Sequence, residues 1–233
     1  MPTPTTTSVL LIGASRGLGR AIAEEYLTRG SRVVATVRDS SRTDLPDLLA
    51  ASDGRLEIEH VDIDDAEQVQ SLHGRLADRE FDLLFIVAGI TNGAEETVVD
   101  VATDEFTRLM ITNALSPLRT VEALSDLVAP AGTIAVMSSG QGSIANNERG
   151  GFEIYRASKS ALNQLMRSYA ARHRDDQRTL LLTAPGWVRT ELGGPNARLT
   201  IGESVPGLVT AIEERHGRGG LEFVDYQGQT VAW

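Results

Sequence analysis

The sequence predicts an α/β protein: a Rossmann-type, doubly wound parallel sheet of about seven strands with helices on both faces. Short, nearly continuous apolar runs recur along the 233 residues, which is typical of strands that are buried on both faces. Amphipathic stretches with a helical period separate these runs, and strict alternation of strand and helix predicts right-handed βαβ units. A glycine-rich turn follows the first run directly, where such folds bind dinucleotides.

The predicted elements follow one another along the whole chain. Gly30 stands where a helix commonly ends on a left-handed residue. No internal repeat, low-complexity tract or linker interrupts the series, so residues 1–233 are expected to form a single dinucleotide-binding and catalytic domain, with residues 1–7 as a flexible tail. Strands are expected at residues 8–12, 31–37, 56–61, 81–88, 132–137, 179–183 and 221–224, and helices at residues 17–29, 44–50, 64–78, 103–128, 153–173 and 202–216.

The composition excludes several classes of protein. Apolar residues make up 41% of the chain and charged residues 23%, as in ordinary globular proteins. A formal net charge of −10 argues against a nucleic-acid partner, which needs a basic surface. With no cysteine and four scattered histidines, neither a disulfide nor a metal site is expected. There is no signal peptide and no membrane-spanning apolar run, so we expect a cytoplasmic protein without a membrane partner.

The turn at residues 13–19 (GASRGLG) lies between the first strand and the first helix. Its glycines let the backbone approach a pyrophosphate, whose charge then meets the positive end of the helix. The spacing is G-x-x-x-G-x-G, and the alternative interpretation is a tight connection without a ligand. The position between strand and helix favours a cofactor site that includes Gly13, Ser15, Arg16, Gly17, Leu18 and Gly19.

The end of the second strand indicates which dinucleotide is bound. NAD-binding sites place an acid there to hold the ribose hydroxyls. Here the strand ends in Arg38, and Arg16 stands in the glycine-rich turn. Two guanidinium groups can bind a 2′-phosphate, although either arginine alone is also consistent with a solvated surface charge. Asp39 follows one position later and is expected to point outward, so the sequence favours NADP(H) over NAD(H).

Tyr155 and Lys159 are four residues apart in the fifth predicted helix and are expected to share one helix face. An ammonium group about 4 Å from the phenolate would lower the pKa of the tyrosine from near 10 towards neutral pH, as general acid–base catalysis requires. This spacing also occurs by chance. Ser139 supports the functional interpretation, because it follows the fifth strand at the sheet edge where α/β proteins bind ligands, and its hydroxyl can bind a substrate oxygen there.

Asn113 lies inside the fourth predicted helix, where asparagine is a poor helix former. By itself it is consistent with a helix irregularity, a buried polar group or a functional side chain. In order and spacing, the glycine-rich turn together with Asn113, Ser139, Tyr155 and Lys159 resembles the short-chain dehydrogenase/reductase family over nearly the whole chain.

The resemblance implies a role for each matching residue. It implies that Tyr155 donates and accepts the proton, and that Lys159 lowers the pKa of Tyr155 and binds the nicotinamide ribose. It implies that Ser139 orients the carbonyl and that Asn113 holds a water of a proton relay. The further cofactor contacts that it implies are Asp62 at the adenine amino group, Ile63, Ala88, Gly89, Pro185, Gly186, Val188, and Thr190 near the carboxamide.

A narrower similarity is to the C-factor and sniffer-type carbonyl reductase branch of that family. It lies in residues 185–197, in residues 203–205, in the ending 223–233, and in the gap of 16 positions from Ser139 to Tyr155. The sequence therefore predicts an NADP(H)-dependent oxidoreductase that interconverts a carbonyl and an alcohol by hydride transfer. The alternative is a dinucleotide-binding regulatory or signalling protein with little turnover, against which the complete set of site residues argues.

Other positions carry smaller expectations. Val87 stands where the family has an asparagine that ties the central strands together, so we expect some lost rigidity and unchanged chemistry. Trp187 is expected either to pack over the cofactor or to fill the core. Asp64 and Asp65 are expected to cap a helix, and residues 172–176 to form a solvated helix end. The short segment between the fifth and sixth predicted helices that follows Thr190 predicts an open cleft for bulky or varied carbonyls. The physiological substrate, the direction of the reaction and the choice between monomer and homo-oligomer stay open.

Overall fold

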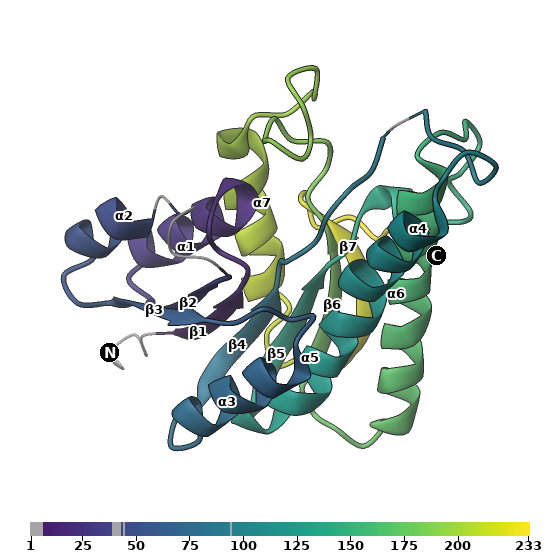
Figure 1. Cartoon of the computed structure of the whole chain (residues 1–233). Helices are drawn as coiled ribbons and strands as arrows, with labels where there is room; N and C mark the ends of the chain where they lie inside the picture. The colour runs from purple at the N-terminus through teal and green to yellow at the C-terminus, as the bar shows by residue number, and fades with distance from the viewer. Residues whose placement is uncertain (1–6, 39–42, 44, 94) are drawn as a thin grey trace.

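The computed structural model describes residues 7–38, 43, 45–93 and 95–233. Its strands form one parallel sheet in the order β3-β2-β1-β4-β5-β6-β7 (Figure 1). The strand order reverses between β1 and β4, and such a reversal opens a crevice at the carboxyl ends of the strands, where α/β sheets bind ligands. The strands are β1 (Ser8–Ile12), β2 (Arg32–Val37), β3 (Leu56–His60), β4 (Phe81–Ile86), β5 (Val128–Met137), β6 (Thr179–Ala184) and β7 (Gly220–Asp225).

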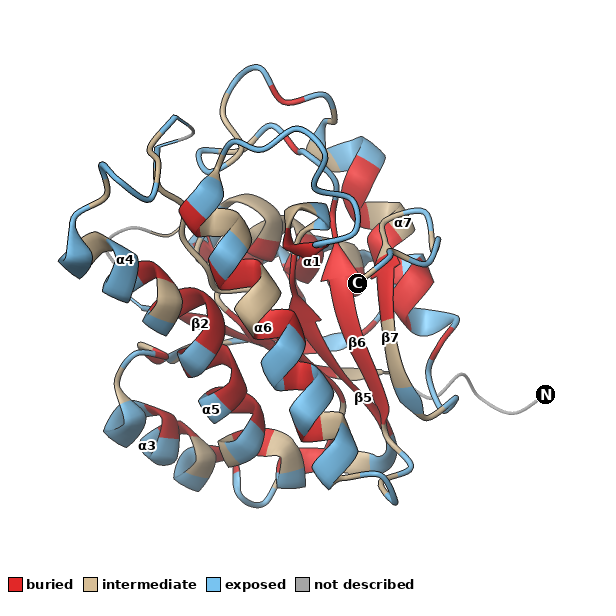
Figure 2. Cartoon of the chain, turned by 90° about the vertical axis from the view of Figure 1, so that its right-hand side faces the viewer, coloured by how far each residue is buried: buried red, intermediate tan, exposed pale blue. Residues whose placement is uncertain are grey.

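Helices cover both faces of this sheet (Figure 1). Strand β1 shows why, because its side chains alternate between two apolar clusters. Leu10 and Ile12 face the cluster with α3, α5 and α6, whereas Val9 and Leu11 face the cluster with α1, α2 and α7. In Figure 2 the buried residues accordingly line the strands and the inner sides of the helices. The helices are α1 (Gly17–Thr28), α2 (Leu45–Ala51), α3 (Ala66–Leu76), α4 (Thr103–Met110), α5 (Ser116–Leu124), α6 (Glu153–Arg172) and α7 (Ile201–Glu213).

The predicted fold class is confirmed, and most element bounds agree to within a few residues. The helix expected at 103–128 is the main exception. Its middle is a π-helical turn, η2 (Ile111–Leu115), and its end is a 3-10 turn, η3 (Ser125–Leu127), after which β5 begins earlier than expected. Pro117 gives the physical reason for the interruption: it lacks an N–H, so the α-helical hydrogen bond to the carbonyl of Asn113 cannot form.

Several smaller expectations are settled at the ends of elements. Gly30 follows α1 with φ of +88°, as expected. Asp65 caps α3, because its side chain accepts hydrogen bonds from the N–H groups of Glu67 and Gln68. Asp64 does not cap that helix; its Oδ2 accepts a hydrogen bond of 2.6 Å from Thr112 Oγ1. The main-chain oxygen of Thr7 accepts a hydrogen bond from the N–H of Arg32 in β2 (2.9 Å), so residue 7 contacts the sheet, and the rest of the tail expected at residues 1–7 lies outside the described residues.

The segment at 172–176 is largely solvated, as expected: Arg172, Arg174 and Asp175 are exposed, and His173 and Asp176 are partly buried. The carboxylate of Asp176 lies 2.6 Å from the guanidinium of Arg178, and both side chains are less than one-fifth exposed. Arg172 pairs with Glu122 of α5. One local ion pair and one exposed ion pair to α5 thus accompany this helix end. Within the described ranges, no helix is long and apolar enough to cross a membrane, and no cluster of side chains is arranged to hold a metal ion.

Candidate active site

The glycine-rich turn is packed so closely against the sheet that two positions have no room for a side chain. A Cβ on Gly13 would lie 2.7 Å from the main-chain nitrogen of Ala88, and one on Gly19 would lie 2.0 Å from the oxygen of Gly13. The N–H groups of Gly13 and Ala14 donate to the side chain and the main-chain oxygen of Thr36 (3.0 and 2.8 Å). Strand β2 thus holds the turn directly in front of α1.

The first turn of α1 is open to an anion. Arg16, which precedes the helix, has an extended backbone and makes no side-chain capping bond, and the first turn contains no acidic residue. The first N–H groups of the helix therefore lack a side-chain cap, and no nearby carboxylate opposes the positive end of the helix dipole. Ser15 and Leu18 flank this end, and the oxygen of Ser15 accepts a hydrogen bond from Thr43 Oγ1 (3.0 Å).

Arg16 and Arg38 both lie at the sheet edge next to this turn, and both carry exposed guanidinium groups. Arg16 pairs with Glu191 at 2.7 Å, and Nε of Arg38 lies 4.0 Å from a carboxylate oxygen of Asp62. The arginine side chains are 54% and 66% exposed, and exposed ion pairs contribute less than about 1 kcal/mol. Either guanidinium can therefore be redirected towards a phosphate at little cost. Asp39 lies outside the described residues.

Ser139 and Tyr155 meet at the carboxyl end of β5. Ser139 begins the 3-10 turn η4 (Gly140–Gly142), and its Oγ accepts the N–H of Gln141 (3.1 Å). Tyr155 lies in the first turn of α6, and its phenol is hydrogen-bonded with the Ser139 side chain. Burial raises the pKa of Tyr155 to about 12, against the lowering effect of the Ser139 hydrogen bond. The expectation that Lys159 brings this pKa towards neutrality is therefore wrong for the protein alone.

Lys159 is the single lysine of the sequence, and it is only 3% exposed. Its Nζ donates to the oxygen of Met137 at 2.9 Å and lies 5.9 Å from the centre of the Tyr155 ring. Burial lowers the pKa of Lys159 to about 8, a range that an arginine cannot reach. Lys159 is thus a buried, titratable cation held against the carboxyl end of β5.

Asn113 is fully buried in the π-helical turn η2, and its side chain braces two elements. Its Oδ1 accepts the N–H of Ile90 (2.9 Å), and its Nδ2 donates to the oxygen of Ile90 (2.9 Å) and to Ser158 Oγ (3.0 Å). Ser158 in turn donates to the main-chain oxygen of Tyr155 (2.8 Å). Both amide donors are used within the protein, so we expect the relay water that the resemblance implies at the main-chain carbonyl of Asn113, to which Pro117 cannot donate.

The loop after β4 runs between these two parts of the site. The N–H of Ala88 donates to the oxygen of Ile12 (3.1 Å). A Cβ on Gly89 would lie 3.3 Å from Asn113 Oδ1 and 3.5 Å from Nζ of Lys159. The backbone at Ala88 and Gly89 therefore lies against the Gly13 turn on one side and the catalytic candidates on the other.

Ile63 and Val87 point into the core and not into the site. Ile63 is 8% exposed and belongs to the cluster that contains α3 and α5, so a contact with a cofactor would involve its main chain. Val87 is partly buried and packs against the cluster that contains α1 and α7. Apolar contacts thus take the place of the family amide, and the loss of rigidity at Val87 stays a prediction.

The segment after β6 reaches back to the glycine-rich turn. Gly186 has φ of +81°, and a Cβ there would lie 2.5 Å from Leu199. Val188 is buried and pairs with Leu199. A Cβ on Gly17 would lie 3.7 Å from the side chain of Thr190. These contacts bring Thr190 beside the start of α1, and its contact with the carboxamide stays a prediction.

Two further residues of this segment are placed by hydrogen bonds. The oxygen of Pro185 accepts from Ser204 Oγ (2.6 Å). Trp187 is 48% exposed, and its Nε1 donates to the oxygen of Gly193 (2.8 Å), so the alternative that it fills the core is wrong. From there to α7 the described chain forms turns and a single bridge with no helix, which is consistent with an open cleft.

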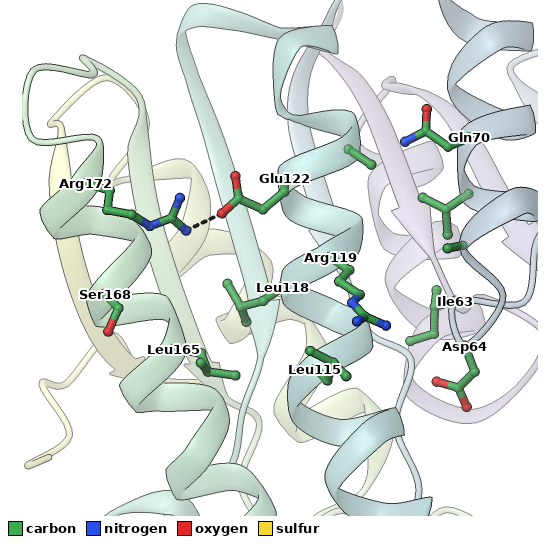
Figure 3. A pocket seen from close by; sticks show the side chains of 13 residues that line it. Ile63, Asp64, Gln70, Leu115, Leu118, Arg119, Glu122, Leu165, Ser168 and Arg172 are labelled. Carbon is green, nitrogen blue, oxygen red and sulfur yellow. Dashed lines mark hydrogen bonds and ion pairs between the residues drawn. The ribbon is translucent and has the colours of Figure 1, made fainter.

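One hollow of the described structure lies away from this site. A cavity of about 660 Å³ lies between α3, α5 and α6, away from Ser139 and Tyr155, and the ion pair of Glu122 and Arg172 borders it (Figure 3). Ile63 is the one predicted site residue in its lining. The catalytic candidates are therefore assigned from chemistry and hydrogen bonding, and not from cavity size.

Sequence reasoning missed several residues that complete the site. Ser158, adjacent to Lys159, connects Asn113 to Tyr155, and Pro117 could have been noticed because it stands four positions after Asn113. Asn92 and Gln141, on the loops after β4 and β5, each bury a side-chain oxygen that has no hydrogen-bond donor among the described residues. Gln141 stands two positions after Ser139, which is the signal that could have drawn attention to it.

Comparison with known proteins agrees with this geometry. Residues 7–198 match the family model of short chain dehydrogenases. A Burkholderia multivorans protein crystallised with bound NADP is 56% identical, with a TM-score of 0.96 over 98% of this chain and 100% of that one. A carbonyl reductase from Pseudomonas aeruginosa PAO1 in complex with NADP is 36% identical, with a TM-score of 0.91 and the same coverage.

Three further relatives also match the chain, two of them enzymes by name and one a signal. The carbonyl reductase Sniffer of D. melanogaster is 28% identical, with a TM-score of 0.87 over 98% of this chain and 100% of that one. The 1-hydroxy-2-glutathionyl-2-methyl-3-butene dehydrogenase of Rhodococcus sp. strain AD45 is 30% identical over 97% of this chain and all of the relative. The C-signal of Myxococcus xanthus is 36% identical over 65% of this chain and 92% of the relative. The predicted resemblance, including its branch, is confirmed.

Proposed function

The chain belongs to the short-chain dehydrogenase/reductase family of oxidoreductases, and on that premise we propose that it uses NADP(H) to interconvert a carbonyl group and an alcohol. The observation that carries the proposal is the meeting of Ser139, Tyr155 and Lys159 at the carboxyl end of β5, beside the loop at Ala88 and Gly89. A hydroxyl, a phenol and a buried ammonium on one edge of a dinucleotide-binding sheet suit proton transfer to a carbonyl oxygen.

The residues present fit a dinucleotide. Gly13 and Gly19 pack against neighbouring backbone with no room for a Cβ, so the turn is held in front of α1, and the open first turn of α1 suits a pyrophosphate. When bound, NADP(H) would donate or accept the hydride. The contacts proposed for it are Gly13, Ser15, Arg16, Gly17, Leu18, Gly19, Arg38, Asp62, Ile63, Ala88, Gly89, Tyr155, Lys159, Pro185, Gly186, Val188 and Thr190.

Proton transfer follows from the pKa values of the two titratable groups. Because the pKa of Tyr155 is raised to about 12, its phenol is protonated at neutral pH and can donate to the substrate oxygen while Ser139 donates a hydrogen bond to the same atom. Lys159, with a pKa lowered to about 8, is mainly an ammonium at pH 7 and stabilises the phenolate that remains. In the protein alone this protonation pattern favours carbonyl reduction over alcohol oxidation.

The preference for NADP(H) rests on Arg16 and Arg38. Both guanidinium groups are exposed at the turn and at the end of β2, and their present partners, Glu191 and Asp62, are weak competitors for a phosphate dianion. The 2′-phosphate that distinguishes the two cofactors would recruit both arginines. NADH offers them no such group.

The rim of the site suggests the class of carbonyl. Large apolar side chains are exposed on each loop that follows β4, β5 and β6, where a soluble surface has little reason to place them. An open cleft with this rim suits bulky, largely apolar ketones or aldehydes. The side chains are Val98, Val99, Ile144, Trp187 and Leu192, which are 66%, 88%, 75%, 48% and 49% exposed.

The test is turnover. We expect the purified protein to oxidise NADPH in the presence of bulky ketones or aldehydes, with kcat/KM for NADPH above that for NADH. Tyr155→Phe removes the proton and keeps the ring, so the rate should fall by about 10³-fold while NADPH binding, measured by fluorescence titration, stays within about twofold. Failure to reduce any member of a broad carbonyl panel would overturn the proposal.

A regulatory or signalling role without turnover is the second candidate, and the similarity to the Myxococcus C-signal favours keeping it in the test. The two roles differ in what Tyr155→Phe does in the cell. A dinucleotide-dependent signal would survive this substitution, because the fold and the cofactor contacts are kept. An enzyme would lose its cellular effect together with its turnover.

A further inference from the structure

The loop that joins Ser139 to Tyr155 forms one wall of the proposed cleft, and few of its residues are tied to other elements. Near its start, the oxygen of Gly142 accepts hydrogen bonds from Ser160 Oγ and Asn163 Nδ2 of α6 (3.0 and 3.1 Å). At its end, the oxygen of Gly151 accepts from Arg156 Nε (2.8 Å). Between these points the hydrogen bonds of residues 146–150 remain within the loop itself.

One contact in the middle of the loop comes from a distant part of the chain. The N–H of Ala145 donates to the main-chain oxygen of Trp233 at 3.0 Å. Figures 1 and 2 place this end of the chain near the start of α6 and the carboxyl ends of β6 and β7. Among the described loop anchors, it is the one that α6 does not supply.

Trp233 is itself held firmly enough to act as an anchor. Residues 229–231 fold back on β7, where the N–H of Val231 donates to the oxygen of Phe223 (2.8 Å). The Trp233 ring lies 5.8 Å from the ring of Phe223, centre to centre, and the guanidinium of Arg167 lies 4.5 Å from the Trp233 ring centre. Ring packing and a cation–π contact, each contributing about 0.5–1.5 kcal/mol, fix the tryptophan against β7 and α6.

We propose that Trp233 is a positioning residue for the carbonyl substrate: it pins the loop at Ala145 and so sets the wall of the cleft next to Ser139. The neighbouring Ile144 is 75% exposed, so the pinned residue carries an apolar side chain at the rim. Loss of the anchor frees residues 143–151 to move, which weakens binding of a bulky ketone more than it slows the proton transfer of bound substrate. The part of this inference that concerns substrate rests on the proposed function.

The experiment compares Trp233→Ala with the matched control Val231→Ala. Both residues are partly buried and pack against the same core cluster, but the hydrogen bond to the loop is made by Trp233, whereas Val231 bonds to Phe223. Trypsin cleavage after the exposed Arg149 reports loop mobility without any need for turnover. We expect Trp233→Ala to speed this cleavage about tenfold and Val231→Ala to leave it within about twofold.

Kinetics supply the second measurement. For Trp233→Ala we expect KM for a bulky ketone to rise about tenfold, with kcat and the Kd of NADPH within about twofold of wild type. Trp233→Phe keeps an aromatic ring against Phe223, so its KM should lie between those of wild type and Trp233→Ala. This milder variant keeps the test decisive if Trp233→Ala does not fold. Equal cleavage rates and equal KM values in Trp233→Ala and Val231→Ala would overturn the proposal. A wild-type protein that reduces no carbonyl would instead refute the proposed function, and the cleavage comparison would still decide whether Trp233 pins the loop.

Discussion

The cofactor half of the site, from β1 to β2, and the catalytic half, around β5 and α6, are built on different principles. In the first, glycine backbone is packed rigidly against the sheet, while the arginines that select the cofactor stand in solvent. In the second, the polar groups are interlocked and buried: Asn113, Ser158 and Lys159 are all below 4% exposed. The comparison indicates that exposed, weakly paired arginines select the cofactor. The groups that support proton transfer are instead held by buried hydrogen bonds.

The largest expected effect tests the rigid backbone of the cofactor half. Gly13 and Gly30 have nearly the same φ, +93° and +88°, but a Cβ would strike Ala88 at Gly13 and meet nothing within 4 Å at Gly30. Gly30→Ala should cost about 1 kcal/mol of unfolding free energy, and Gly13→Ala at least about 4 kcal/mol. Urea denaturation measures both values. Equal costs would show that the turn is not packed as tightly as described.

The next effect tests the interlocked half. Asn113→Ala leaves both the N–H and the carbonyl of Ile90 without the partner that Asn113 supplies, so the unfolding free energy should fall by about 3 kcal/mol. The value of kcat should fall as well. Asn147→Ala is the control, because its Oδ1 makes a single exposed bond to Gly150, and it should cost less than about 0.5 kcal/mol. If the two variants were equally stable, the Asn113 network would not hold the catalytic half together.

Lys159→Met should raise stability while it removes activity. Burial lowers the pKa of this lysine from 10.5 to about 8, so the folded protein binds the proton more weakly than the unfolded chain. The buried ammonium therefore destabilises the fold fully below pH 8, by about 3 kcal/mol, and this cost fades as the pH rises from 8 to 10.5. The substitution also removes the hydrogen bond to Met137, which lowers the unfolding free energy by about 1 kcal/mol and so reduces the net gain in stability.

The measurement for this prediction is unfolding free energy against pH. Lys159→Met should exceed wild type by about 2 kcal/mol at pH 7, and the advantage should disappear above pH 10.5. Because the chain has one lysine, selective isotope labelling of lysine gives one side-chain signal, and NMR titration reads its pKa directly. A titration near 10.5 would contradict the buried, destabilised ammonium.

The smallest effect concerns the exposed arginines. Arg38→Ser should lower kcat/KM for NADPH about tenfold, equivalent to about 1.4 kcal/mol, and leave the value for NADH within about twofold. Arg16→Ser should act in the same direction. Arg32→Ser, at the other end of β2, serves as the control and should change neither cofactor. Loss of activity with both cofactors would show that the arginines have a structural role and do not select the cofactor.

Much of the fold and site could be predicted because the signals are local. Buried parallel strands are continuous apolar runs, and the glycine-rich turn stands directly after the first of them. The spacing of Tyr155 and Lys159 follows from the helix period. Even the π-helical turn had a local signal in Pro117, although a continuous helical pattern at 103–128 concealed it.

The rest depended on contacts between residues far apart in the chain. The partner of Lys159 is Met137, 22 positions away, and burial by elements far apart in the chain raises the pKa of Tyr155 and lowers that of Lys159. The pairing of Arg16 with Glu191 and the contact of Ala145 with Trp233 are equally non-local. Neither hydrophobic periodicity nor a sequence motif indicates which residues far apart in the chain will be in contact.

By itself, the sequence determined the strand–helix alternation, the family and the identity of the catalytic candidates, because these depend on residue type and on spacing along one element. The tertiary structure alone decided the protonation state of those candidates, the bracing role of Asn113 and the exposure of Trp187. A pKa and an exposed fraction depend on desolvation by all the elements packed around a side chain, and that environment exists only once the chain has folded.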